Sequence, residues 1–312
     1  MRLVHGPVTR KDGSGFRRPC VRQFEKGWVA VSLTRSPASD TAAPARTQAV
    51  HHSLPLDQII DTQRFPLDDP GFQAQCRNAL DREGVLSLPG LLLPETLQAL
   101  VREAEAGEAG AFFASSSHNV YLTPPDPALG KDHVFNRQIV STKGCICDDQ
   151  VRKDSALRQL YNSPVFKAFL CAVLGERALF PYADPLSSIN IHYAPEGKEL
   201  GWHFDNSEFA ITLLLQRPTG GGVYEYIRDL RDAERGEMNF EGVEAALDGD
   251  LAPVALDIDP GTLVLFRGRN ALHRVTPTEG DVTRYLVVLA YNGEPDISLS
   301  ETARQTFYGR IT

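Results

Sequence analysis

Three residues of the sequence have side chains that could together hold a metal ion. His203 and Asp205 stand two positions apart in the run GWHFDN (201–206), and His273 follows much later in ALHRV (271–275). On an extended strand, residues two positions apart project from the same face, so His203 and Asp205 point the same way. We expect the fold to bring His273 to the same place.

Two imidazoles and a carboxylate on one side of a metal leave three adjacent coordination positions open, the arrangement of non-haem Fe(II) oxygenases. A 2-oxo acid can fill two of these positions through its C1 carboxylate and keto oxygen, and dioxygen can take the third. The far carboxylate of the acid then needs a fixed cation, and a guanidinium suits it because it donates two parallel hydrogen bonds. Arg284, in the strand-like run after His273, is the candidate.

Composition excludes several other classes of protein. The chain has 312 residues, 42% of them hydrophobic, and a net charge of −8 with no basic stripe in its main body, which argues against a nucleic-acid partner. No apolar run reaches membrane-spanning length, so no membrane partner is expected. The five cysteines are odd in number and scattered, which favours a reducing, cytoplasmic location over a disulfide framework. The oligomeric state is not predicted.

Residues 1–52 differ in composition from the rest of the chain. The first 35 of them are rich in arginine and poor in acidic residues, and residues 36–45 are a proline-containing run of small residues. No amphipathic helix or cleavage pattern of a targeting peptide stands out. We therefore expect residues 1–52 to be a disordered or non-core extension and residues 53–312 to be the functional domain. Deleting residues 1–50 should leave activity intact.

The domain is expected to have a helical N-terminal half and a strand-rich core at about 180–292. Apolar residues recur at helical spacing over 72–83, 94–104 and 154–174, the last interrupted near Pro164, while residues 106–153 look irregular. The alternating runs are 189–193, 209–215, 223–227, 262–266, 271–275 and 284–291. Strands with no helices between them predict an α+β fold, mainly β, with a jelly-roll core and helices on one face of a sheet. The charged segment 228–250 is either a lid or a solvated loop.

Three runs resemble a known family: YADPL (182–186), LGWHFDNSEF (200–209), and GTLVLF (261–266) continuing to LHRVTP (272–277). They are similar to the branch of free-amino-acid halogenases and hydroxylases among the Fe(II)- and 2-oxoglutarate-dependent dioxygenases. That superfamily has a double-stranded β-helix, a cupin-like jelly roll. The resemblance covers roughly residues 86–310 and not the first fifty.

The resemblance implies roles for five residues. His203, Asp205 and His273 resemble the iron ligands, and Arg284 resembles the arginine that pairs with 2-oxoglutarate. Asn190 resembles an inward strand position that helps hold this co-substrate. Halogenating members have a small residue in place of Asp205, which leaves a coordination position for chloride. The carboxylate here therefore implies hydroxylation by O2, with release of succinate and CO2.

The substrate is expected to be a small polar molecule, an amino acid or a derivative of one. The candidates for contact with it are Arg137, for which a carboxylate-binding role is expected, His192, Asn206 and Glu208. His192 could equally be a core or rim histidine, and Asn206 and Glu208 could be loop surface. The same cofactors could also drive desaturation, cyclisation or halogenation. A non-oxygenase, metal-binding cupin-like protein is the alternative from another class, and it would have no need of Arg284.

Overall fold

The computed structural model describes residues 33–35, by their backbone only, and residues 54–312. Strand β1 (Leu33–Arg35) pairs antiparallel with β15 (Ile297–Leu299). The other residues of the expected extension at 1–52 lie outside the described part of the chain. Within that part, no helix is both long and apolar enough to cross a bilayer.

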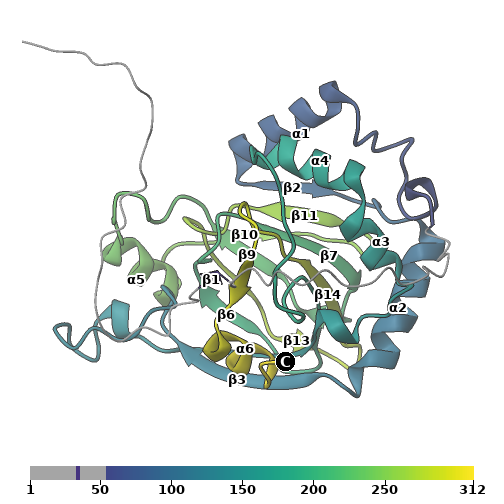
Figure 1. Cartoon of the computed structure of the whole chain (residues 1–312). Helices are drawn as coiled ribbons and strands as arrows, with labels where there is room; N and C mark the ends of the chain where they lie inside the picture. Colours follow the sequence, from purple (N-terminus) through teal and green to yellow (C-terminus); the bar gives the residue numbers. More distant parts are fainter. Residues whose placement is uncertain (1–32, 36–53) are drawn as a thin grey trace, which may run out of the picture.

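The core consists of two antiparallel sheets (Figure 1). A cavity lies between them. The larger sheet contains, in spatial order, β2 (Val85–Leu88), β11 (Leu263–Phe266), β7 (Ala210–Gln216), β14 (Arg284–Leu289), β5 (Ile189–Ala194), β4 (Ile139–Ile146) and β3 (Phe112–His118). The smaller sheet contains β10 (Val254–Leu256), β9 (Tyr224–Ile227), β12 (Leu272–Val275) and β6 (Leu200–His203). A short pair joins β8 (Gly220–Gly221) to β13 (Thr278–Glu279). The predicted jelly-roll core is confirmed.

The alternation of side chains along the larger sheet separates a core from a cavity. On β14, Tyr285, Val287 and Leu289 are buried in the main hydrophobic core. Arg284 and Leu286, which have the opposite parity, line the cavity instead. This division follows from the pleat, since successive residues of a strand point to opposite faces.

Four helices cover the outer face of the larger sheet, as predicted: α1 (Pro70–Glu83), α2 (Pro94–Glu108), α3 (Ala156–Asn162) and α4 (Pro164–Leu174) (Figure 1). Phe166, Phe169 and Leu170 of α4 are fully buried there, and each such side chain stabilises the fold by about 1.5–3 kcal/mol. Gly84 and Gly175 end α1 and α4 in the left-handed conformation, with φ of 71° and 82°. A residue with a Cβ would be strained at both positions.

The prediction of an irregular region at 106–153 is wrong, because β3 and β4 form a hairpin there at the edge of the larger sheet. β3 has the sequence FFASSSH, whose serines give no apolar alternation to recognise. The segment 228–250 contains a helix, α5 (Phe240–Asp248), and the chain closes with α6 (Glu301–Tyr308). Three short 3-10 helices complete the described structure: η1 (Leu56–Gln58), η2 (Val134–Asn136) and η3 (Asp148–Gln150).

Candidate metal centre and its cavity

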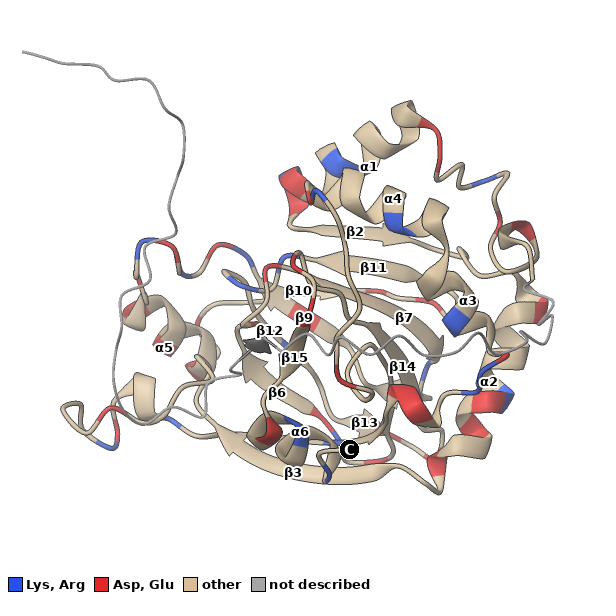
Figure 2. Cartoon of the chain, in the orientation of Figure 1, with Lys and Arg blue, Asp and Glu red and all other residues tan. Residues whose placement is uncertain are grey.

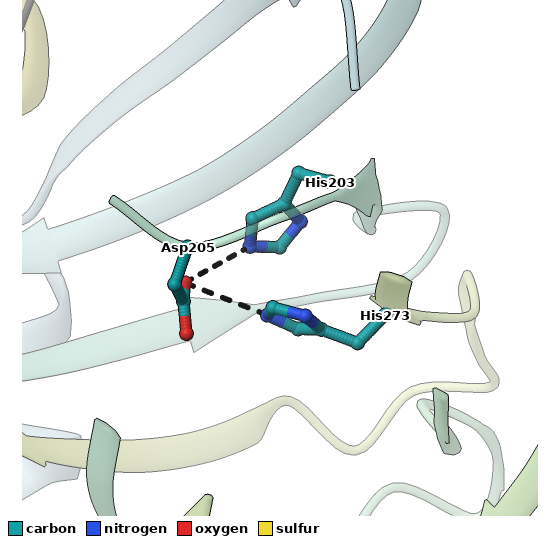
Figure 3. A group of neighbouring side chains, drawn as sticks. All are labelled: His203, Asp205 and His273. Carbon is teal, nitrogen blue, oxygen red and sulfur yellow. Dashed lines mark ion pairs between the residues drawn. The ribbon is translucent and has the colours of Figure 1, made fainter. Parts of the chain in front are cut away.

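His203, Asp205 and His273 meet at one end of the smaller sheet. His203 ends β6 and lies directly opposite His273 of β12 in the strand register. Asp205 Oδ1 lies 3.7 Å from Nε2 of His203 and 3.5 Å from Nε2 of His273 (Figure 3). One potential ligand atom from each residue lies within 4.8 Å of the others. The fold therefore brings together the three residues singled out in the sequence.

Both imidazoles are oriented by the backbone. Nδ1 of His203 lies 2.8 Å from the carbonyl oxygen of Gly201, and Nδ1 of His273 lies 3.0 Å from that of Ala271. Because a carbonyl only accepts, each Nδ1 donates, and in the neutral ring Nε2 then has the free lone pair. Burial, reinforced by the charge of His273, lowers the pKa of His203 to about 3. The neutral ring of His203 thus presents a metal-binding nitrogen towards Asp205.

The carboxylate of Asp205 is partly buried and incompletely satisfied. Its Oδ2 has no hydrogen-bond partner among the described residues. Burial acts to raise the pKa of Asp205, but the imidazole of His273 and other positive neighbours hold it below its ordinary value. A buried carboxylate oxygen without a partner is costly, and a cation bound at Oδ1 would offset this cost by pairing with the charge of the carboxylate. Two imidazole nitrogens and a carboxylate oxygen form the donor set that suits Fe(II), so the residues present fit this metal.

A cavity of about 360 Å³ extends from these residues between the two sheets, and its lining is mainly apolar. Arg284 lies in its wall on the larger sheet, 6% exposed. Burial lowers the pKa of Arg284 to about 10, so the guanidinium remains charged at neutral pH. It makes no hydrogen bond or ion pair with any described residue. A bound anion would stabilise this guanidinium, since burying an unpaired ion is unfavourable by several kcal/mol.

Asn190 and Arg137 do not contribute to this cavity. The amide of Asn190 donates to the carbonyl oxygens of Leu186 and Ile189, and its oxygen accepts from the Tyr308 hydroxyl. Both amide donors are therefore used within the protein. Arg137 lies at the surface, where it pairs with Asp248 of α5 at 2.5 Å.

The remaining predicted contact residues separate into two groups. Asn206 and Glu208 are exposed, and Glu208 forms an ion pair with Arg269 at 3.3 Å. His192 on β5 does line the cavity, and its Nε2 lies 3.3 Å from Nζ of Lys143. Of the four candidates, only His192 is placed to meet a molecule bound in the cavity.

The sequence interpretation missed the cavity residues of the β3–β4 hairpin. Lys143 points into the cavity from β4, and His118 of β3 lies beside His203, with ring centroids 6.3 Å apart. Nε2 of His118 is 2.8 Å from the Ser141 hydroxyl. Only the alternation of Ser141, Lys143 and Cys145 could have indicated an inward face, and it lacks the apolar partner face that makes a strand recognisable.

The sequence matches the model of a family described as Halogenase D over residues 138–308, more than half of the chain. No curated protein matches it. Among solved structures, the non-haem α-ketoglutarate-dependent epimerase SnoN from nogalamycin biosynthesis has a TM-score of 0.50 at 16% identity, covering 72% of this chain and 84% of SnoN. This likeness shows the fold.

Two further solved structures are similar. A 2OG-Fe(II) oxygenase family protein from Burkholderia pseudomallei has 15% identity and a TM-score of 0.44. The alignment covers 72% of this chain and 93% of the Burkholderia protein. A prolyl hydroxylase from Trichoplax adhaerens, in complex with a hypoxia-inducible-factor peptide, has 14% identity and a TM-score of 0.48, covering 72% and 91%.

Proposed function

This chain belongs to the halogenase D family of 2-oxoglutarate-dependent non-haem iron oxygenases, and we propose that it hydroxylates a C–H bond of a small, amino-acid-like molecule. The observation that carries the proposal is the carboxylate of Asp205, between the two imidazoles. With this carboxylate as the third ligand, no position is vacated for a halide. Transfer of a hydroxyl group is then the expected outcome.

We assign the binding of the cofactors to four side chains. Nε2 of His203, Oδ1 of Asp205 and Nε2 of His273 would hold Fe(II), and Arg284 would bind the distal carboxylate of 2-oxoglutarate through its guanidinium. When bound, the iron and the co-substrate supply the activation of O2, with release of succinate and CO2. The apolar wall of the cavity excludes water from the reacting groups and strengthens the charge interactions within it.

The size of the cavity supports a small substrate. Its volume of about 360 Å³ lies near the lower end of the range of ~300–1,000 Å³ found for ligand sites. This space has to accept both 2-oxoglutarate and the molecule to be oxidised. A single amino acid or a compound of similar size is compatible with it.

The test is to incubate the purified protein with Fe(II), 2-oxoglutarate and the standard amino acids and to measure succinate and product masses. We expect succinate and a product that has gained one oxygen atom. His203→Ala and Asp205→Ala should each abolish succinate formation, because each removes a proposed ligand. A matched control is Glu208→Ala, an exposed change close in sequence to Asp205. Substantial succinate from either ligand variant would refute the assignment.

Halogenation is the second candidate, and the family match favours it. The same experiment, with chloride present, separates the two, since halogenation replaces one hydrogen with chlorine and desaturation or cyclisation removes two hydrogens. A chlorinated product from the unaltered protein would show that Asp205 does not block a halide.

A further inference from the structure

Lys143 is an unusual residue for its place in the fold. Among the seven described strands of the larger sheet, Lys143 and Arg284 are the only residues with an acidic or basic side chain other than histidine. Both line the cavity. Figure 2 shows the same contrast: helices and loops carry most of the charges, while β2, β11 and β7 carry none. Lys143 and Arg284 therefore occupy positions where burial disfavours the charged form of the side chain.

Lys143 has no acidic partner in the described structure. Its Nζ contacts His192, 3.3 Å from Nε2 and 3.5 Å from Nδ1. No carboxylate of the described residues lies within ion-pair distance of it. Burial lowers the pKa of Lys143, and the negative charges of Cys145 and Asp205 oppose this effect. Lys143 and Asp205 line the same cavity.

Charge balance shows what the amine lacks. Two positive charges from a ferrous ion and one from Arg284 equal the three negative charges of Asp205 and 2-oxoglutarate. The metal, its co-substrate and Arg284 are therefore neutral without Lys143. A protonated lysine in such a site needs an anion of its own, because buried charges are stable when paired.

Among the described residues, Cys145 is a neighbouring group that could supply this anion, since it lies on the same face of β4. Hydrogen bonds with Cys147 and His192 lower the pKa of its thiol. Cys145 is packed in a separate apolar cluster with Leu186 and Tyr308, however, and it does not line the cavity. An anion entering the cavity is the better partner for Lys143.

We propose that Lys143, with His192 beside it, binds the carboxylate of the substrate. This inference rests on the proposed function and makes it more specific. It identifies the substrate class as free amino acids or similar acids, because a compound attached to a carrier through its carboxyl group would bring no negative charge to Lys143. The role that the sequence interpretation gave to Arg137 passes to this residue inside the cavity.

The experiment is an anaerobic titration monitored by the visible absorption of the Fe(II)–2-oxoglutarate complex. Each standard L-amino acid is added to the unaltered protein, and each one that perturbs the absorption is compared with its primary amide. We expect the acid to bind about thirtyfold or more tightly than the amide, the size of effect found when one partner of a buried charge pair is lost. Lys143→Met should bind acid and amide equally weakly, and Lys143→Arg should restore part of the preference.

Two controls accompany the titration. Cys145→Ser removes the internal rival for Lys143 and should keep the preference for the acid. The affinity for 2-oxoglutarate should be the same in Lys143→Met as in the unaltered protein, and thermal melting should show that the variant is folded.

The possible results distinguish a failure of the role of Lys143 from a failure of the proposed function. Equal binding of acid and amide, or a preference that survives Lys143→Met, would overturn the role of Lys143. So would a loss of 2-oxoglutarate affinity in that variant, which would make the lysine a co-substrate ligand. A normal absorption that no amino acid perturbs would overturn the substrate class. If the unaltered protein gives no such absorption, the proposed function itself fails.

Discussion

Asp205 and Gly268 meet so closely that the glycine defines where the carboxylate can lie. The backbone N–H of Asp205 donates to the carbonyl oxygen of Gly268 at 3.0 Å. A Cβ added at Gly268 would lie 1.8 Å from Oδ2 and 2.6 Å from Cγ of the aspartate. The absence of a side chain at Gly268 therefore leaves the space that the carboxylate of Asp205 occupies. Glycine is required here by this close contact and not by an unusual φ.

Gly268→Ala should weaken metal binding with little effect on the rest of the fold. The added methyl group must push the carboxylate away from its position between the imidazoles, and changes next to metal ligands typically reduce affinity by about 10–100-fold. Titration with Fe(II) or Co(II) under anaerobic conditions measures the effect. Gly130→Ala is the matched control, since a Cβ there meets nothing within 4 Å. Unchanged affinity in Gly268→Ala would mean that Asp205 is not held in place by this contact.

At the scale of elements, the segment 228–250 is attached to the metal centre. Arg231 donates through Nε to the carbonyl oxygen of Arg269 at 2.8 Å and through Nη2 to that of Asp205 at 3.3 Å. Its guanidinium also lies over the Phe204 ring, 4.3 Å from the centroid. One side chain of the segment thus ties together the two loops that carry Asp205 and Gly268. Neither of the sequence interpretations, a lid or a solvated loop, anticipated this contact.

Arg231→Met should loosen these loops while keeping the volume of the side chain. It removes two charge-assisted hydrogen bonds and a cation–π contact, interactions of about 1.5–3 and about 2 kcal/mol respectively when partly buried. We expect weaker Fe(II) binding. We also expect more succinate per molecule of product, because a mobile ligand would let 2-oxoglutarate be consumed without oxidation of the substrate. Arg235→Met is the control, as Arg235 belongs to the same segment but is exposed, pairing with Asp232 at 2.7 Å. Equal effects of the two changes would argue against a role for Arg231 in positioning.

Elements with a clear apolar period were predictable, and the hairpin without one was not. Strand β14 alternates between core residues and cavity residues, and α4 has an apolar stripe with Gly175 at its end, so both were recognised. The β3–β4 hairpin lies at the edge of the sheet, and no position of β3 is fully buried. Its residues therefore carry almost no periodic signal.

The same difference explains which site residues could be found. His203, Asp205, His273 and Arg284 are rare residue types at a recognisable spacing, whereas Lys143 is a single lysine in an irregular-looking region. Asn190 has the expected inward parity but donates to neighbouring carbonyls. Parity along a strand predicts the direction of a side chain but not whether its polar atoms are already engaged.

For the whole molecule, the proposed cofactor-binding residues come from opposite sheets. The candidate iron ligands lie on or just after β6 and β12 of the smaller sheet, while Arg284 lies on β14 of the larger sheet. A metal bound alone would engage one sheet. A metal with 2-oxoglutarate reaching Arg284 would connect the two sheets across the cavity and so stabilise the domain as a unit.

Thermal melting should therefore rise in two steps, first with the metal and then with 2-oxoglutarate in its presence. A ligand at about 100 times its Kd adds about 2.7 kcal/mol to the free energy of unfolding, which for a domain of this size is roughly 5 °C in Tm. His203→Ala should lose both increments. Arg284→Met should keep the metal increment, lose that of 2-oxoglutarate, and melt no lower than the unaltered protein when ligand-free, because an unpaired buried charge has been removed. Lys143→Met is the matched control, expected to keep both increments; if it loses the second increment while Arg284→Met keeps it, the distal carboxylate binds to the lysine and the two cations have exchanged roles.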